Sequence, residues 1–331
     1  MTATPLGLGS VGAADKIRSS PQAMQSCLRQ VARLGGDVWT ADLSELVPVL
    51  VEVARVDLCL ARLVEGHADA LRIIQQAQER PRNGVYGVWA SRSVGTGIKA
   101  ANVNGRWQLT GELRFASGIN LIDRALVPAW LDADHHVLMD ISAGTVDPDL
   151  DSWQTSAMDA SRSFTVRLDA EPVDTEPVGP TDFYLSRVGF IVGGLCVAAV
   201  WTGGAHHVVD AVATSVRAFT TTPHQLRRIG VMEQAAWQAQ TALDAVVRRL
   251  PQLSAEAATR EIGMARSAVV NACEVVLDEA SRVVGPAGLS RNVRLARAVH
   301  DLSIYIRQHH LDIELQRLGQ HGVATRELLA E

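Results

Sequence analysis

The sequence predicts a mostly helical α+β protein in which an antiparallel β-domain separates two helical blocks. Apolar residues recur at three- and four-residue spacings over 13–80 and again from about 183 onward, which is the period of amphipathic helices. Between these blocks apolar and polar residues alternate, which is the period of half-buried strands. A chain of 331 residues is long enough for more than one domain. We expect an N-terminal helical domain (1–82), a middle β-barrel or sandwich (83–182) and a C-terminal four-helix bundle (183–331).

The composition is that of a globular protein dominated by small and aliphatic residues. Hydrophobic residues make up 47% and the formal net charge is −5, with no Lys/Arg run, so the chain has no electrostatic footprint for nucleic acid. The N-terminus lacks a secretory signal pattern, and the apolar run 188–201 is too short to span a bilayer. The cysteines are far apart, lack metal-type spacing and indicate buried thiols in a reducing compartment: Cys27, Cys59, Cys196 and Cys273. We therefore expect a soluble cytoplasmic protein that binds neither nucleic acid nor membrane.

The N-terminal block contains two predicted helices, over 14–34 and 43–78, separated by two glycines. The second helix carries Glu65 and His67 within a run of aliphatic residues. In one interpretation they are satisfied polar groups at a helix contact. In the other, His67 lies on the wall of a ligand cavity.

The centre of the β-domain is marked by the Asn-Gly dipeptide at 104–105. This dipeptide favours a two-residue primed turn, because both residues of such a turn need positive φ. A strand is expected on each side of it, and the second of these ends in Phe-Ala-Ser-Gly at 115–118. Further strands are predicted at 85–91, 124–130, 136–141 and 164–168.

The C-terminal block contains four long predicted helices, at 184–215, 224–250, 254–284 and 291–319. Thr221 or Thr222 is expected to cap the second helix with Pro223 near its first position, and Ser254 to cap the third. A Gly-Pro pair at 285–286 ends the third helix. Short connections make an up-down bundle the expected arrangement.

Taken in order, these elements and several local strings resemble the acyl-CoA dehydrogenase superfamily over nearly the whole chain. The most specific string is NGRWQLTGELRFASG (104–118), which looks like the strand pair of that family. Three weaker strings are similar to the family's R-x-x-F, glycine-rich turn and R-x-x-R-D helix, and stand at 217–219, 284–288 and 294–319. The first of the three is one residue shorter than the family pattern. The resemblance implies the three-part fold expected above and bound FAD.

For the flavin ring, the resemblance implies five residues of the β-domain. Trp89, Ala90 and Ser91 match the strand that faces the pyrimidine side of the ring, although the family's T-E-P-x-x-G-S-D string is absent here. Phe115 matches the aromatic residue stacked near the isoalloxazine, and Ser117 the hydroxyl residue beside flavin N5. The alternative is that the two aromatic residues are ordinary core side chains.

For the rest of the cofactor, the resemblance implies three residues of the helical block. Arg217 matches the arginine on the pyrophosphate, a role suited to a guanidinium because it can donate two hydrogen bonds to phosphate oxygens. Phe219 belongs to the same string, and Gly285 to the glycine-rich turn. Alternatively, Arg217 is a solvated cation at a helix end, favoured by the helix dipole.

The expected catalytic base is missing from this chain. Acyl-CoA dehydrogenases remove the α-proton with a glutamate, and counting through the terminal helix puts His309 in its place. The other family position for the glutamate falls near Ser186 and Arg187, which also lack a carboxylate. His309 and His310 are therefore the candidate acid–base residues, because an imidazole titrates near neutrality. Alternatively, they bond the last carbonyls of a helix.

Two more histidine pairs, at 135–136 and 206–207, have no third ligand at a usable spacing, so no metal site is predicted.

Three functions remain open from the sequence. The leading one is FAD-dependent desaturation of an acyl thioester or related acid, carried on CoA or another carrier, with a non-standard base. The second is a flavin-dependent monooxygenase on the same fold, since such members also lack the glutamate. The third is a non-catalytic subunit of a flavoprotein. The resemblance also implies a homodimer or homotetramer.

Overall fold

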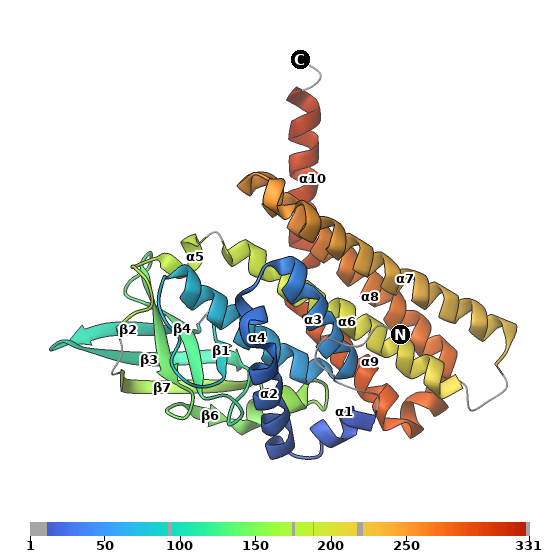
Figure 1. The fold of residues 1–331 in the computed structure, drawn as a ribbon, viewed down its shortest axis with the longest axis horizontal. Coiled ribbons are helices and arrows are strands. Elements are labelled where there is room, and N and C mark those ends of the chain that lie inside the picture. Colours follow the sequence, from blue (N-terminus) through green and yellow to red (C-terminus); the bar gives the residue numbers. More distant parts are fainter. Residues whose placement is uncertain (1–11, 92–94, 174–175, 188, 217–220, 329–331) are drawn as a thin grey trace. The chain divides into compact units, whose positions relative to one another are not determined.

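The computed structural model describes residues 12–91, 95–173, 176–187, 189–216 and 221–328 (Figure 1). The chain divides into two compact units, which are described separately. The sheet unit consists of Met1–Leu46 and Cys59–Phe190, and the helical unit of Val47–Leu58 and Ile191–Glu331. The sheet unit thus contains the β-strands and most of the N-terminal helical block, whereas residues 47–58 of that block belong to the helical unit. The division into three domains stays a prediction.

The N-terminal block forms more helices than its periodicity predicts. The stretch 14–34 is two helices, because Ser20 caps the second by accepting a hydrogen bond from Ala23 N at 3.1 Å and Pro21 occupies its first turn. The stretch 43–78 is also two helices, interrupted at Asp57, a residue type of low helix propensity. The helices are α1 (Gly12–Ile17), α2 (Pro21–Gly35), α3 (Leu43–Val56) and α4 (Leu58–Gln76), with a 3-10 turn η1 (Gly36–Thr40) after α2.

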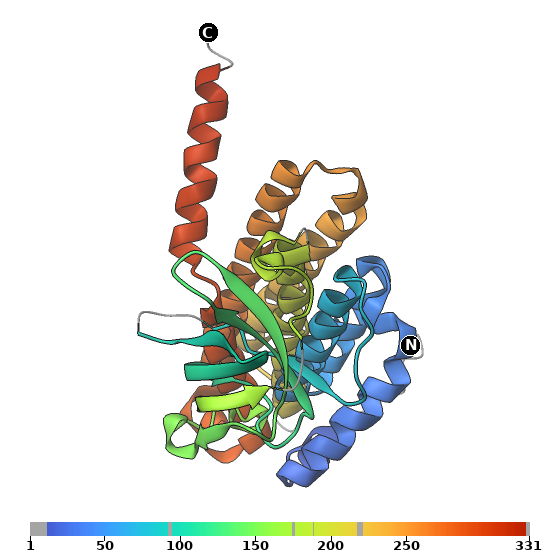
Figure 2. The ribbon, with the colours of Figure 1, turned by 90° about the vertical axis from the view of Figure 1, so that its left-hand side faces the viewer.

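One seven-stranded sheet forms the middle of the sheet unit, in the order β1-β4-β2-β3-β7-β6, with β5 also paired to β4 (Figures 1 and 2). The sheet is mixed, where antiparallel pairing was expected throughout, because β1 and β2 each pair parallel with β4. The strands are β1 (Tyr86–Val88), β2 (Gly97–Val103), β3 (Arg106–Ala116), β4 (Arg124–Trp130), β5 (His136–Ser142), β6 (Asp147–Asp149) and β7 (Phe164–Val173).

The predicted hairpin is confirmed in detail. Asn104 and Gly105 have φ of 53° and 81°, so both central residues of the turn take the left-handed conformation. The pairing of Val103 with Arg106 closes the hairpin, and β3 continues to Ala116. This register places the end of β3, with Phe115 and the following Ser117, at the far end of the strand from the turn.

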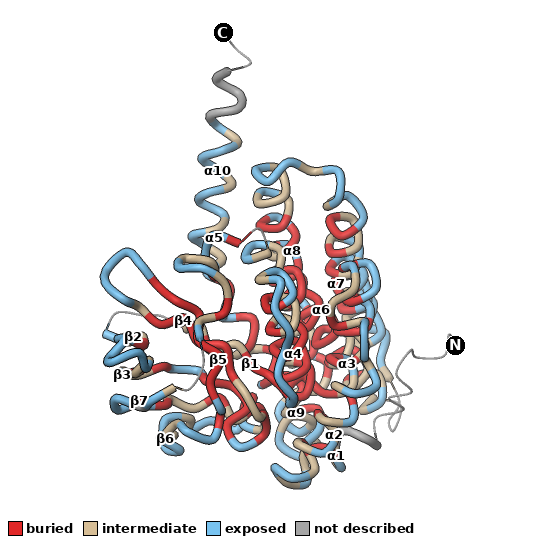
Figure 3. The backbone as a smooth tube through the Cα atoms, turned by 60° about the vertical axis from the view of Figure 1, so that its left-hand side comes forward, coloured by how far each residue is buried: buried red, intermediate tan, exposed pale blue. Residues whose placement is uncertain are grey.

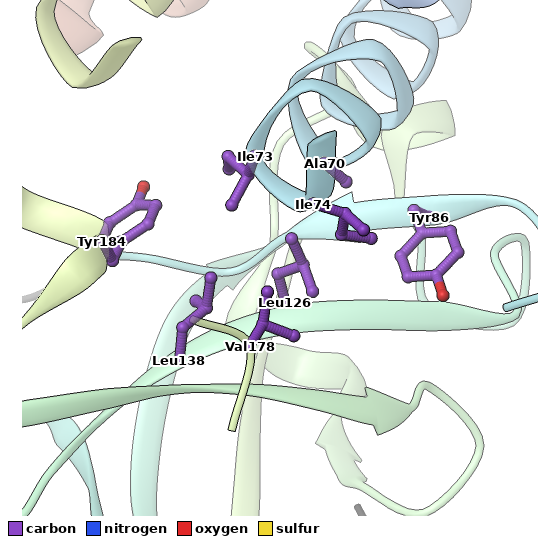
Figure 4. Packing of buried hydrophobic residues seen from close by; sticks show 8 residues of the cluster. All are labelled: Ala70, Ile73, Ile74, Tyr86, Leu126, Leu138, Val178 and Tyr184. Carbon is purple, nitrogen blue, oxygen red and sulfur yellow. The ribbon is translucent and has the colours of Figure 1, made fainter. Parts of the chain in front are cut away.

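The core of the sheet unit lies between α4 and the sheet (Figure 4). Side chains from one face of α4 point at residues of β1, β4 and β5, all of which are buried. Strand β4 is buried along almost its whole length, as Figure 3 shows, and it has strand neighbours on both edges. The cluster is Ala70, Ile73, Ile74, Tyr86, Leu126, Leu138, Val178 and Tyr184.

The C-terminal helices pack as a bundle within the helical unit, with α7 and α8 side by side along most of their length (Figure 1). The predicted caps are present: Thr222 and Gln225 form a capping box, with Pro223 in the first turn of α7, and Ser254 accepts a hydrogen bond from Ala257 N. The helices are α5 (Phe183–Ser186, in the sheet unit), α6 (Gly189–Val216), α7 (Pro223–Arg249), α8 (Ala255–Arg291), α9 (Val293–Tyr305) and α10 (Leu311–Leu328), with η4 (Leu250–Gln252) and η5 (Ile306–Gln308) between them.

The predicted last helix, 291–319, is in fact two helices. It is broken by η5 and by His309, whose backbone is extended with φ −85° and ψ 117°. The loop between α9 and α10 therefore carries both candidate catalytic histidines. Beyond it, α10 extends away from the other helices of its unit (Figure 2).

Helix α6 is the central helix of the helical unit. A Cβ on Gly203 would lie 2.3 Å from Val51 O, and one on Gly204 3.0 Å from Leu302, so glycines let α6 approach α3 and α9 closely. By length and composition α6 could cross a membrane, but 61% of its most apolar window is buried inside the protein. Such burial is typical of the core helix of a soluble protein.

Candidate functional site

The end of β3 presents an aromatic ring to solvent. Phe115 is 57% exposed, and its φ of 60° is unusual for a residue with a large side chain. The ring packs edge-on against Trp153, with the centroids 6.2 Å apart and the planes at 86°. More than half of its surface is thus open to a ligand, so Phe115 is not the ordinary core residue of the alternative interpretation.

Two residues further on, Ser117 is 7% exposed and begins a chain of buried hydroxyl groups. Its Oγ lies 2.7 Å from Ser163 Oγ, which lies 2.8 Å from Ser161 Oγ. Ser161 Oγ donates to Met158 O at 2.7 Å. The backbone fixes the same contact, since Gly118 N donates to Ser161 O at 2.8 Å. Two of these four hydrogen bonds, Ser117 to Ser163 and Gly118 to Ser161, hold the end of β3 against the segment that leads into β7, and the other two order that segment itself.

Trp89 is brought to the same place from the end of β1. Its indole Nε1 donates to Ser117 O at 2.9 Å, and the ring is 2% exposed. Trp89 is thus a core residue that holds Ser117. Ala90 and Ser91 follow it and are half-buried. Of the five predicted ring residues, the structure joins Trp89 to Ser117 by this bond and puts Phe115 two residues before the serine.

Together, the stacking face of Phe115 and the fixed hydroxyl of Ser117 fit a flat heteroaromatic group with a polar edge. The isoalloxazine ring implied by the sequence resemblance has this character. The predicted phosphate-binding residues Arg217 and Phe219 lie outside the described residues, so that part of the cofactor site stays a prediction.

In the helical unit, His309 is buried, with 8% of its surface exposed. Its Nε2 lies 3.0 Å from Ser267 Oγ of α8, so the ring bonds a hydroxyl and not a helix carbonyl. Its centroid lies 6.0 Å from that of Trp201 on α6. Burial, followed by the positive charge of Arg266, lowers the pKa of His309 to about 4. The imidazole is therefore neutral at physiological pH, where titration near neutrality was expected.

Arg266 is the fixed charge of this cluster. Its guanidinium lies 5.6 Å from the centroid of Trp201, and burial lowers its pKa. His310, the other candidate, is exposed. The two adjacent histidines therefore differ in environment, and only His309 has the buried, fixed position of a catalytic group.

Gly285 lies in α8, where its φ of 61° and the following Pro286 turn the helix. A Cβ there would meet nothing within 4 Å. Its predicted part in binding the cofactor stays a prediction, while the glycine-containing turn itself is confirmed.

On α4, Glu65 and His67 are satisfied polar groups, as one of the two sequence interpretations had it. His67 Nδ1 accepts a hydrogen bond from Tyr86 N at 3.2 Å, and burial lowers its pKa to about 4. Glu65 is bonded to Arg62 at 2.8 Å, and burial raises its pKa to about 7.

In each of the other two histidine pairs, one ring also contacts a polar group of the protein. His135 Nδ1 lies 2.8 Å from a carboxylate oxygen of Asp182, and His207 Nδ1 lies 2.8 Å from Arg55 O. Within the part of the chain that the structure describes, no group of three His, Cys, Asp or Glu side chains could hold a metal ion.

Sequence reasoning missed the supporting residues of both clusters: Ser161, Ser163, Trp201, Arg266 and Ser267. No local pattern marks them, because the contacts that join them to the predicted residues span 42 residues or more of chain, as between Ser267 and His309 and between Ser163 and Ser117. Only the pairing of β3 with β7, and the packing of α6 and α8 around the α9–α10 loop, bring them to their partners.

Comparison with known proteins places the fold. No protein-family model matches the sequence, and no curated protein sequence matches it. Among solved structures, the chain is similar to the methanesulfinate monooxygenase MsuC from Pseudomonas fluorescens, with a TM-score of 0.82 and 18% identity over 97% of this chain and 96% of that one. It is also similar to the FMN-bound dibenzothiophene monooxygenase TdsC from Paenibacillus sp. A11-2, with a TM-score of 0.77 and 15% identity over 95% and 96%.

A third similar structure is butyryl-CoA dehydrogenase from Megasphaera elsdenii, with a TM-score of 0.77 and 14% identity over 98% of this chain and 99% of that one. At these identities the likeness shows the fold. The resemblance found in the sequence is thus confirmed at that level: the chain has the acyl-CoA dehydrogenase fold over almost its whole length.

Proposed function

We propose that this protein is a flavin-dependent monooxygenase acting on a small organic molecule. Reduced flavin supplies two electrons to O2, after which one oxygen atom enters the substrate and the other leaves as water. The observation that carries the proposal is the state of His309, the residue to which the sequence resemblance assigns the place of the dehydrogenases' basic glutamate. That state is a neutral imidazole with a pKa of about 4, held by Ser267.

Removal of a carbon-bound proton needs a base whose pKa lies near the working pH. With a pKa of about 4, the imidazole of His309 is roughly a thousandfold weaker as a base than a group titrating near 7. Glu65 does have a pKa of about 7, but its carboxylate is 6% exposed and is bonded to Arg62. Oxygen transfer from a flavin does not require this proton removal, so the site suits monooxygenation better than desaturation.

The described residues then have distinct roles. Phe115 would stack on the flavin ring and Ser117 would contact its polar edge. Trp89 holds Ser117 in position through its indole bond. Arg217 would bind the phosphate groups. We propose FAD as the flavin, on the resemblance in the sequence, with FMN as the alternative because the similar TdsC has been solved with FMN.

His309 serves the substrate. Its Nε2 is engaged by Ser267, and no described residue bonds its Nδ1. The Nδ1 atom can therefore accept or donate a hydrogen bond to a substrate, depending on the tautomer that Ser267 selects. Because the ring stays neutral above pH 5, this contact does not change with pH over the physiological range.

Desaturation of an acyl thioester remains the second candidate, favoured by the likeness to butyryl-CoA dehydrogenase over nearly the whole of both chains. In that case another group must supply the base. A homodimer or homotetramer in the cytoplasm, acting on a freely diffusing or carrier-bound substrate, is the proposed setting in either case.

Two assays on the purified protein, loaded with FAD or FMN, separate these functions. The first measures oxygen uptake in the presence of NADH and a flavin reductase, with a panel of sulfinates, thiophenes and acyl-CoAs. Oxygen uptake that depends on one of these compounds supports the monooxygenase. The second follows the flavin spectrum under anaerobic acyl-CoA, where bleaching would establish desaturation in its place. A protein that binds neither flavin would indicate a non-catalytic subunit.

A further inference from the structure

The three serine hydroxyls at the end of β3 form a chain with a fixed direction. Each hydroxyl has a single hydrogen to donate. Ser161 donates its hydrogen to Met158 O, because a carbonyl oxygen can only accept. The hydrogen between Ser161 and Ser163, whose Oγ atoms are 2.8 Å apart, must then come from Ser163. By the same reasoning, the hydrogen between Ser163 and Ser117, at 2.7 Å, comes from Ser117.

Ser117 Oγ is consequently left with lone pairs and no hydrogen to offer a ligand. Burial makes this direction hard to reverse, because the three residues are 0%, 8% and 7% exposed in the order Ser161, Ser163 and Ser117. Reversal would leave Ser161 Oγ and Met158 O 2.7 Å apart with no hydrogen between them, and two buried acceptors facing each other are unfavourable even though Met158 O also accepts from Ser161 N at 3.0 Å. The backbone cannot shift to relieve it, since Gly118 N and Trp89 Nε1 hold the same segment on both sides.

The two redox states of a flavin differ at the ring-edge nitrogen N5. In the oxidised ring N5 is only an acceptor, whereas in the reduced ring it carries a hydrogen and is a donor. Ser117 Oγ, which has no hydrogen to donate, can accept a hydrogen bond from N5 of the reduced ring. Against N5 of the oxidised ring it forms no hydrogen bond, because both atoms are acceptors. The direction of the serine chain therefore discriminates between the two states.

We propose that Ser161 and Ser163 are positioning residues that make Ser117 an acceptor, and that this selects reduced over oxidised flavin. The inference rests on the proposed function, in which the flavin edge contacts Ser117. The reduced flavin gains a hydrogen bond to Ser117, whereas the oxidised flavin brings two buried acceptors face to face. This difference corresponds to about 5- to 100-fold in affinity for the two redox states.

The test is equilibrium binding of FMN and FAD, each in the oxidised and the anaerobically reduced form, to the full-length protein. For the unmodified chain we expect the reduced form to bind at least 5-fold more tightly. In Ser163→Ala, Ser117 regains its hydrogen and can donate to oxidised N5, so the ratio should fall toward one, mainly through tighter binding of the oxidised form. Ser161→Ala should also lower the ratio, because Ser163 can then donate its hydrogen to Ser117 and leave the Ser117 hydrogen free. This variant replaces Ser163→Ala in the test if Ser163→Ala does not fold.

Ser281→Ala is the matched control, since this half-buried serine only bonds a carbonyl of its own helix, Leu277 O at 3.0 Å. It should leave the ratio unchanged. Flavin binding with equal affinity for both states, or a ratio unaffected by both serine variants, would overturn the inference and leave the proposed function intact. Failure of the folded, unmodified protein to bind either flavin in either state would instead overturn the proposed function and the inference with it.

Discussion

At the scale of single residues, burial decides the protonation of two imidazoles. His67 and His309 lie in different units, yet each is engaged through one ring nitrogen and has a pKa of about 4. Neither state is visible in the sequence, where both residues are histidines on or near apolar helices. The sequence identified His309 by its position relative to the terminal helix, whereas its neutral state follows from burial and from the positive charge of Arg266.

Replacement of His309 by alanine is expected to lower turnover by roughly 100-fold, the lower range for loss of an acid–base or orienting group. His310→Ala is the control, because that side chain is exposed. Steady-state kinetics of both variants, with flavin binding measured in parallel, check this. Equal loss in the two variants, or full activity of His309→Ala, would remove His309 from the proposed site.

His67 should make the fold sensitive to mild acid. Its pKa is about 4 in the folded chain and about 6.5 when unfolded, so between these values the unfolded state binds more protons. The free energy of unfolding is therefore highest above pH 6.5 and falls as the pH drops toward 4, by up to about 3 kcal/mol.

In His67→Asn, the amide oxygen can still accept from Tyr86 N but does not titrate in this range. Urea unfolding between pH 7 and pH 4 should show a shallower loss of stability than in the unmodified chain, with the remaining slope in part from His309. His300→Asn, at an exposed position, should keep the original slope. An unaltered slope in His67→Asn would show that its imidazole is not held neutral.

At the scale of elements, the sequence predicted best where the chemistry is local. The Asn-Gly turn, the capping box at Thr222 and strand β4 follow from neighbouring residues, and the structure confirms them. It predicted worst where a helix is interrupted within a continuous apolar pattern, as at Asp57 and at His309. The helical spacing of apolar residues does not reveal a break of one or a few residues, because the same spacing continues in the next helix.

Two helical glycines offer a paired test of the packing of α6. Gly203→Ala would place a methyl group 2.3 Å from Val51 O, and should destabilise the protein by about 1–3 kcal/mol through overpacking. Gly230→Ala, on α7, meets nothing within 4 Å and should stabilise it by about 0.5–1 kcal/mol, because alanine favours the helix. Chemical denaturation of both variants measures the difference. A stabilising Gly203→Ala would contradict the close approach of α6 and α3.

At the scale of the whole molecule, the order of helices and strands was enough to predict the fold, which is confirmed by structures at 14–18% identity. The parallel pairings of β4 were not predicted, because alternation identifies a strand but not its partner. The serine chain was missed for the same reason, since Ser117 and Ser163 are 46 residues apart. The reaction depends on such contacts and therefore needed the structure.

The fate of molecular oxygen tests the proposed reaction most directly. The protein, supplied with reduced flavin by a reductase, is given a substrate that stimulates oxygen uptake under oxygen-18 gas, and the product is analysed by mass spectrometry. Incorporation of one oxygen-18 atom into the product, with its loss in His309→Ala, is the result that the proposal predicts. A product that is desaturated and carries no label would contradict it and identify the chain as a dehydrogenase.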